Sequence, residues 1–249
     1  MPVSIMLDAG HGGRDPGAVY NGRQEKDDVL KLVLAIGEIL QNSGIDVEYT
    51  RTTDIYETPF QKATEANEAG VDFFISIHRN SSPLANQYMG VESLIYNLSG
   101  IKYEMAENIN AQLETVGFKD LGVKARPHLV VLRRTKMPAL LIEVGFINSD
   151  SDNTLFDKNF NDIAQAIADG ILTLPMVLPP TAAGFFLLLL FSRRRPFGIL
   201  LYEEFGIKVV QAWAGCIIAA TVIAFPLMYR NARAAFEQID VNLIHAART

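Results

Sequence analysis

Hydrophobic residues recur in two patterns along the first two thirds of the chain. Short apolar or alternating runs bounded by turn-forming residues, such as "VDFFISIH" and "ALLIEVGF", predict strands. Stretches with apolar residues three or four positions apart predict helices. The expected strands cover residues 3–8, 45–50, 71–78, 91–97, 129–132 and 139–146. The expected helices cover residues 26–43, 57–69, about 101–117 and 158–172.

Strands that alternate with helices are typical of an α/β domain, in which helices cover both faces of a mostly parallel sheet. In such sheets ligands bind at the carboxyl ends of the strands. His11 follows the first expected strand, His78 ends another, and Glu143 lies late in a third. The pattern therefore predicts that chemically active side chains gather at one edge of the sheet.

The pattern changes after Leu174. Residues 170–192 carry no charge but contain three prolines, and residues 209–229 carry no charge over 21 positions. A helix of the second length spans about 30 Å of hydrocarbon. We therefore expect two domains, residues 1–174 and residues 175–249, the second being a hydrophobic, largely helical segment of membrane type.

Charge and the N-terminus narrow the function classes. Residues 1–174 hold 15 basic and 24 acidic residues, a net charge of −9, and residues 175–249 have a net charge of +3. An acidic first domain argues against nucleic acid as a partner, because phosphate contacts need clustered Lys and Arg. The N-terminus has no basic leader and only a short apolar stretch, so we expect no secretory signal peptide. The single cysteine, Cys216, excludes an internal disulfide framework.

Two candidate residues lie between the first expected strand and the first expected helix. His11 lies in "DAGHGGRDPGA", where neighbouring glycines allow the backbone to approach a ligand closely. A histidine in a tight turn that binds nothing is the alternative. Glu25 lies just before the first expected helix, where the helix dipole favours an acid even without a metal.

Two further candidates lie in apolar strands. His78 ends "FFISIH", where burial disfavours its charge and leaves two ring nitrogens to satisfy. A core histidine bonded to a backbone carbonyl is the alternative. Glu143 interrupts "ALLIEVGF", and a carboxylate there must be paired, metal-linked or protonated. A buried structural ion pair is the alternative for Glu143.

Together these residues fit a zinc hydrolase. His11, Glu25 and His78 form a three-ligand set that leaves the fourth position on Zn²⁺ open to water. Glu143 would take the proton of the activated water and deliver it to the leaving amine. No HExxH or CxxC motif is present, so the fold has to bring these residues together.

Four blocks of sequence, "LDAGHGGRDPGA", "EK" at 25–26, "ISIHRNSS" and "MPALLIEVGFINS", resemble the zinc-dependent N-acetylmuramoyl-L-alanine amidases, cell-wall hydrolases of bacteria and their phages. The likeness covers about residues 3–173. It implies a twisted sheet of about six strands flanked by helices, and cleavage of the amide between N-acetylmuramic acid and L-alanine of the peptidoglycan stem peptide. It also implies one Zn²⁺ held by His11, Glu25 and His78, with Glu143 as the catalytic glutamate. Arg79 departs from the family pattern, in which a small residue is common. His128 has no ligand role in the family and is expected in a loop.

Residues from about 173 to 249 resemble an internal piece of a molybdate-type ABC transporter permease. This resemblance implies contact with the membrane, so we expect a location at the membrane or in the cell wall. Two alternative functions stay open at this point. One is a truncated membrane component of a transporter, and the other is a wall-binding module without catalysis.

Overall fold

A computed structural model describes residues 3–173, together with the isolated positions 192, 199, 217 and 228. Contacts divide the chain into two compact units, Met1–Leu174 and Pro175–Thr249. The predicted membrane segment, residues 209–229, lies outside the described residues except at positions 217 and 228. Within the described positions, no helix combines the length and apolar character needed to cross a membrane.

The first unit is built on a six-stranded sheet with strand order β4-β1-β5-β8-β6-β7. All neighbouring strands are parallel except β6 and β8, which are antiparallel, so the expected mostly parallel sheet is confirmed. The six strands are β1 (Ser4–Ala9), β4 (Asp46–Tyr49), β5 (Phe73–Asn80), β6 (Val91–Ile95), β7 (Asp120–Ala125) and β8 (Ala139–Phe146). A small separate hairpin pairs β2 (Val19–Tyr20) with β3 (Arg23–Gln24).

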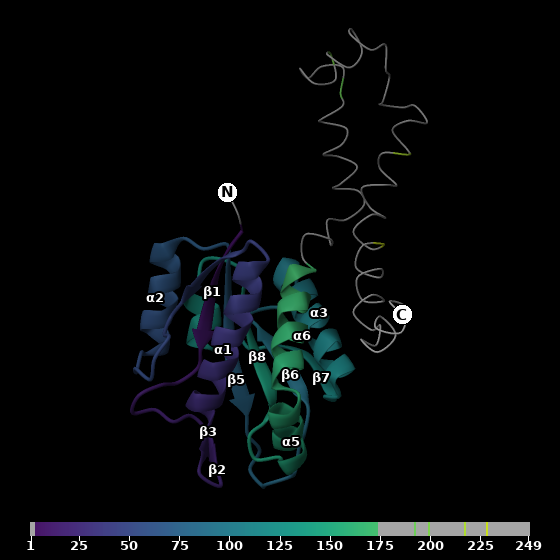
Figure 1. Cartoon of the computed structure of the whole chain (residues 1–249). Coiled ribbons are helices and arrows are strands. Elements are labelled where there is room, and N and C mark those ends of the chain that lie inside the picture. The colour runs from purple at the N-terminus through teal and green to yellow at the C-terminus, as the bar shows by residue number, and fades with distance from the viewer. Residues whose placement is uncertain (1–2, 174–191, 193–198, 200–216, 218–227, 229–249) are drawn as a thin grey trace, which may run out of the picture. The chain divides into compact units, whose positions relative to one another are not determined.

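Helices cover both faces of this sheet. The helices are α1 (Glu25–Asn42), α2 (Pro59–Ala69), α3 (Ile101–Val116), α4 (Val130–Arg134), α5 (Asp150–Lys158) and α6 (Phe160–Leu172). The helices α1 and α6 run side by side across the sheet in Figure 1, and α3 packs on α6. The helices α2 and α4 pack on each other and cover part of the opposite face.

The two faces differ in composition because successive residues of a strand point to opposite sides. Under α1, α3 and α6, the strands contribute a continuous apolar core that includes Ile77, Ile142 and Val144. The other face has a smaller apolar cluster near α2 and α4. Toward the carboxyl ends of its strands this face carries His78 and Glu143. The alternation therefore separates the main core from the predicted chemistry.

Local sequence explains where α2, which covers part of this second face, begins and ends. Thr58 is its N-cap: the side chain accepts from the N–H of Gln61, and the Gln61 side chain reaches back to the N–H of Thr58. Pro59 occupies the first helical position, where no backbone donor is needed. Gly70 ends the helix with a positive φ of 70°. These signals fix α2 independently of its few buried apolar residues.

One expectation about secondary structure was wrong, and several short or partly buried elements were not expected. The segment 129–132 is not a strand, because residues 130–134 form the helix α4; a four-residue apolar run does not distinguish the two. The strand β7 was not expected, since its residues are only partly buried and include Gly122. The helix α5 was not expected either, and it has a polar sequence in which only Asp152 and Phe156 are buried.

Candidate active site

His11 lies in the loop that follows β1, in an unusual backbone conformation. Its φ is 58°, in the left-handed region that few residues other than glycine adopt. Its Nδ1 lies 2.8 Å from Oδ2 of Asp15, and its Nε2 lies 3.2 Å from Oε2 of Glu25. Asp15 therefore orients the imidazole and leaves Nε2 facing Glu25. Such a carboxylate partner is the usual second contact of a metal-binding histidine.

Glu25 is the first residue of α1, and its side chain is 4 % exposed. The N–H of Ala18 donates to Oε2 at 2.9 Å, and the N–H of Arg79 donates to Oε1 at 3.0 Å. Burial raises the pKa of this carboxyl, but hydrogen bonds and charge from His11 and His78 outweigh it and hold the pKa well below its ordinary value. Glu25 is therefore held as a carboxylate with both oxygens fixed.

His78 lies near the end of β5, with Nδ1 2.9 Å from Oε1 of Glu25. Its ring stacks on Gly10, where an added Cβ would lie 2.4 Å from the imidazole. Gly17 makes room in the same way, since a Cβ there would lie 2.5 Å from Oε2 of Glu25 and 2.7 Å from His11. Both glycines are therefore required by the close approach of backbone and side chains around this cluster.

The structure brings His11, Glu25 and His78 together, with donor atoms all within 4.8 Å of one another. Among the described residues this is the one group of three or more potential metal ligands. Burial lowers the pKa of His11, but the contacts with Glu25 and Asp15 raise it to about 9. Two imidazoles and one carboxylate, partly shielded from solvent, match the donor set of a catalytic zinc site. Their role as ligands is still a prediction.

Glu143 lies beside this cluster on the neighbouring strand. It is paired in register with His78 across β5 and β8, and with Glu92 across β6 and β8. Its Oε2 is buried, without a hydrogen-bond partner among the described residues. Burial, with the nearby charges of Glu25 and Glu92, raises the pKa of Glu143 to about 7. No basic side chain forms an ion pair with it in the described part of the chain, so the predicted alternative of a structural ion pair finds no support there.

Glu92 continues the row of polar residues on the far side of Glu143. It accepts a hydrogen bond from Nδ2 of Asn80 at 2.9 Å and forms an ion pair with Lys124. Glu92 is therefore neutralised by its own partners, whereas Glu143 is not. Of the two adjacent carboxylates, only Glu143 keeps a buried oxygen free to accept a proton.

Arg79, next to His78, points to the opposite side of β5 and is buried. Its guanidinium pairs with Asp28 at 2.7 Å and contacts Asn153 at 2.8 Å. Burial lowers the pKa of Arg79 to about 10, although the charge of Asp28 raises it. Sequence reasoning noted Arg79 only as unusual, because its partners lie 51 and 74 positions away.

A cavity of about 280 Å³ opens beside the cluster. His11 and His78 line one side, and Leu129, Val131 and Leu141 form an apolar wall. His128 also lines this cavity and is exposed in the loop before α4, as the sequence predicted.

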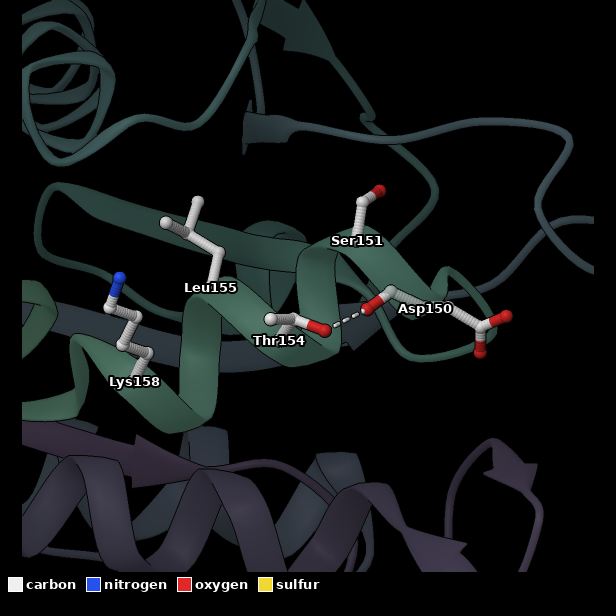
Figure 2. A pocket seen from close by; sticks show the side chains of 5 residues that line it. All are labelled: Asp150, Ser151, Thr154, Leu155 and Lys158. Carbon is white, nitrogen blue, oxygen red and sulfur yellow. Dashed lines mark hydrogen bonds between the residues drawn. The ribbon is translucent and has the colours of Figure 1, made fainter.

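A larger hollow of about 480 Å³ lies elsewhere. It runs along α5 and is lined by residues of that helix alone, with Thr154 hydrogen-bonded to the carbonyl of Asp150 (Figure 2). It is lined by no histidine, and the cluster of His11, Glu25 and His78 lies outside it. The smaller cavity therefore belongs to the candidate site, and the larger one does not.

Asp15 is the partner that sequence reasoning missed most plainly. It was interpreted only as part of the turn Asp15-Pro16-Gly17, yet its carboxylate also bonds to His11. The spacing of four residues from a candidate ligand was the available signal. Asp8 was also missed; it is a buried acid at the end of β1 that pairs with the buried Lys62 at 2.7 Å.

Comparison with known proteins agrees with this geometry. Residues 5–173 match the profile of the Amidase_3 family, described as N-acetylmuramoyl-L-alanine amidase. The chain is 40% identical over 175 residues to a sporulation-specific N-acetylmuramoyl-L-alanine amidase of Bacillus subtilis, covering 68% of this chain and 67% of that protein. It is 37% identical over 178 residues to an endolysin of Bacillus phage SPP1, covering 69% of this chain and 65% of that protein. The chain thus spans about two thirds of the length of these relatives.

A further relative is of a different class. The molybdenum transport system permease protein ModB of Escherichia coli is 47% identical over 85 residues, which cover 34% of this chain and 37% of the permease. The match is therefore to a minor part of both proteins. It is consistent with the resemblance seen in the second unit but identifies no complete transporter.

Solved structures support the similarity to N-acetylmuramoyl-L-alanine amidases. An N-acetylmuramoyl-L-alanine amidase from Clostridium difficile 630 superposes with a TM-score of 0.66 at 30% identity, covering 71% of this chain and 98% of that one. The family profile spans more than half of the chain and includes every element that carries the site. The chain therefore belongs to the N-acetylmuramoyl-L-alanine amidase family.

Proposed function

We propose that the first domain, residues 1–174, hydrolyses peptidoglycan by cleaving the amide between N-acetylmuramic acid and L-alanine of the stem peptide. Peptidoglycan amidase activity is what the family match and the solved relatives support. The observation that carries the proposal is the buried Oε2 of Glu143, which has no hydrogen-bond partner among the described residues and lies beside the cluster of His11, Glu25 and His78. A protein that only binds the cell wall has no need of an uncompensated acid at that position.

The ligand set fits zinc. His11, Glu25 and His78 would hold the ion, with Asp15 orienting His11 and backbone N–H groups orienting Glu25. Zinc, when bound, supplies Lewis acidity that lowers the pKa of water and polarises a carbonyl. One carboxylate and two neutral imidazoles leave the ion a net positive charge for this purpose.

Glu143 moves the proton. Its free Oε2 accepts a proton from the water that attacks the lactyl carbonyl carbon, and the same oxygen then donates that proton to the leaving nitrogen of L-alanine. A raised pKa suits both steps, because a group with a pKa near the working pH can accept and release a proton. The apolar wall of the adjacent cavity, formed by Leu129, Val131 and Leu141, excludes water from one side of the substrate.

The test combines metal analysis of the full chain with digestion of purified peptidoglycan. We expect about one zinc per chain and release of free stem peptides whose new N-terminus is L-alanine. The control is the same digest after removal of metal with a chelator, which should be inactive and should recover on addition of Zn²⁺. Intact glycopeptide in the presence of bound zinc would contradict the proposal.

We also propose that residues 175–249 associate with a membrane, and that the protein is located at the membrane or in the cell wall. The similarity to ModB and the uncharged run of residues 209–229 support it. Extraction of membranes with alkaline carbonate tests this role, and we expect the full chain to stay with the lipid. A chain ending at Leu174 should be released while still digesting peptidoglycan. Loss of digestion on truncation would contradict the division into two domains.

A further inference from the structure

The guanidinium of Arg79 joins three segments of the fold that meet beside the candidate metal ligands. Its side chain, in the strand position after His78, is completely buried. We propose that Arg79 is a positioning residue that fixes Glu25 in the geometry needed to hold a zinc ion. The inference rests on the proposed metal site and adds the layer of residues behind it.

Arg79 lies where the pairing of β5 with both of its neighbouring strands becomes irregular or ends. Pairing of β5 with β8 runs in register as far as His78 and shifts before Asn80. From His78 to Asn80 the chain advances two residues along β5 but three along β8, so the extra residue of this bulge belongs to β8. The pairing of β5 with β1 ends at Ile77, so the N–H of Arg79 has no strand partner on that side. The main-chain N–H of Arg79 donates to Oε1 of Glu25 at 3.0 Å instead. Because strand pairing does not fix this N–H, its position depends on another anchor.

The side chain supplies that anchor. Nη1 donates to Oδ2 of Asp28 at 2.7 Å, and Nη2 donates to Oδ1 of Asn153 at 2.8 Å. The guanidinium lies 4.2 Å from the centre of the Phe156 ring. Arg23 holds the same Oδ2 of Asp28 through its Nε at 2.6 Å. The side chain of Arg79 is therefore held by α1 on one side and by α5 on the other.

Asp28 completes a circuit that returns to Glu25. Both are in the first turn of α1, three positions apart, and so lie on the same side of the helix. Arg79 consequently acts on Glu25 by two routes. Its N–H bonds to the carboxylate, and its guanidinium bonds to the helical turn that carries this carboxylate. A shift of Glu25 away from His78 would stretch both contacts.

Stability alone does not require a charged residue here. A buried ion pair carries a desolvation cost, and apolar residues of similar size often replace one without loss of stability. The Nε of Arg79 has no hydrogen-bond partner among the described residues, which adds to this cost. What an apolar residue would not provide is the directed hydrogen bond from this position of β5 to Asp28. We therefore assign the charge to orientation of Glu25 rather than to packing against Phe156.

The test measures zinc affinity of the full, folded chain by competition with a chromophoric chelator. We expect Arg79→Met to weaken Zn²⁺ binding by about 10- to 100-fold, the range found when groups that orient a metal ligand are removed. Arg79→Lys keeps the charge but not the planar fork, so it should recover only part of the affinity. The increase in Tm on adding Zn²⁺ should shrink in the same order.

Ile171→Ala is the matched control. Ile171 is buried in α6, in the main core, and contacts none of the residues of the circuit in the contacts described above. Its loss should lower the Tm of the metal-free protein through a cavity while leaving zinc affinity unchanged. Equal zinc affinity of Arg79→Met and wild type would overturn the proposal. So would a loss of affinity in Ile171→Ala as large as that in Arg79→Met.

Asn153→Ala provides a milder variant in case Arg79→Met does not fold. It removes one contact of the guanidinium and should weaken zinc binding less than Arg79→Met, in the same direction. Unchanged affinity in both Asn153→Ala and Arg79→Lys would then reject the positioning role. A wild-type chain that binds no zinc rejects the proposed metal site itself, and with it this role. A wild type that binds zinc while every variant equals it rejects only the role of Arg79.

Discussion

The two faces of the central sheet are made by the same strands but serve different ends. Ile77 and Ile142 are fully buried in the main core, whereas the next residues, His78 and Glu143, lie on the opposite face at the candidate site. Since side chains alternate along a strand, a single residue step separates packing from chemistry. One short sequence can therefore specify both a stable core and a row of candidate site residues.

The helices reinforce this difference. Three long helices cover the apolar face, and their buried residues join the strand core in one continuous cluster. On the other face α2 and α4 pack mainly on Met6, Phe74 and Leu141, toward the amino ends of the strands. The cavity lies beyond them. The second face is thus the less completely covered one, and this leaves room for a substrate beside the cluster.

Of the variants that test the difference between the two faces, Glu143→Ala should have the largest effect on activity. We expect turnover of peptidoglycan to fall by about 10²- to 10⁴-fold, because the proton acceptor is lost. Zinc content should be retained, since Glu143 is not among the proposed ligands. The measurement is a digest with parallel metal analysis. His78→Ala is the companion variant and should lose both zinc and turnover. Wild-type turnover in Glu143→Ala would remove the general-base role.

Asp8→Asn tests how much a buried ion pair on the polar face contributes to stability. The effect of this substitution on stability should depend on pH. Burial raises the pKa of Asp8, but Lys62 and the hydroxyl of Ser76 outweigh it and hold the pKa below its ordinary value of 3.8. A depressed pKa contributes stability that is present above the ordinary value and is lost as pH falls below it. At pH 7 the variant leaves the buried Lys62 without its anion, which costs about 3–5 kcal/mol.

We therefore expect the difference in free energy of unfolding between wild type and Asp8→Asn to become smaller at acid pH. Urea unfolding of wild type and variant at pH 7, 5 and 3 measures it. The difference in free energy of unfolding should be constant between pH 7 and 5 and smaller at pH 3. A gap that widens toward pH 3 would contradict the assigned direction of the pKa shift.

Ile142→Ala tests the apolar face and is the counterpart of Glu143→Ala. It should lower the free energy of unfolding by about 2–5 kcal/mol, because it leaves a cavity in a fully buried position. Activity per folded molecule and zinc affinity should stay close to wild type. The measurement is urea unfolding together with an activity assay at a temperature where the variant is folded. A catalytic loss as large as that of Glu143→Ala would show that the two faces are not separable.

The same comparison explains what the sequence could predict. The strands β1, β5 and β8 carry long apolar runs because they are covered on both faces, and these runs were found correctly. The partly buried strand β7 has no such run, and α4 has one that is too short to interpret. The strand β4 was predicted although it is only partly buried, because its residues alternate between apolar and polar. A clear pattern of apolar positions, or clear cap signals as in α2, therefore decided which elements were predicted.

In the candidate site, too, some residues could be predicted from the sequence and others could not. His11, His78 and Glu143 stood out because each is a polar residue in an apolar or glycine-rich setting. Their supporting contacts did not stand out, since the contact between Arg79 and Asp28 spans 51 positions and depends on how α1 lies against β5. Residue type and setting predict the candidate site residues, but only the folded chain reveals the groups that hold them in place.

The backbone at His11 limits which ligand, and so which metal, the proposed site could accommodate. A φ of 58° is tolerated by histidine, asparagine, aspartate and glycine, but it costs other residues roughly 1–2 kcal/mol. Cysteine, the ligand that would favour softer ions, is among the disfavoured residues. An engineer seeking a thiolate-bound metal here would first have to rebuild the turn of residues 10–13. The backbone conformation at residue 11, more than the size of the side chain, therefore restricts which residues could serve as a ligand at this position.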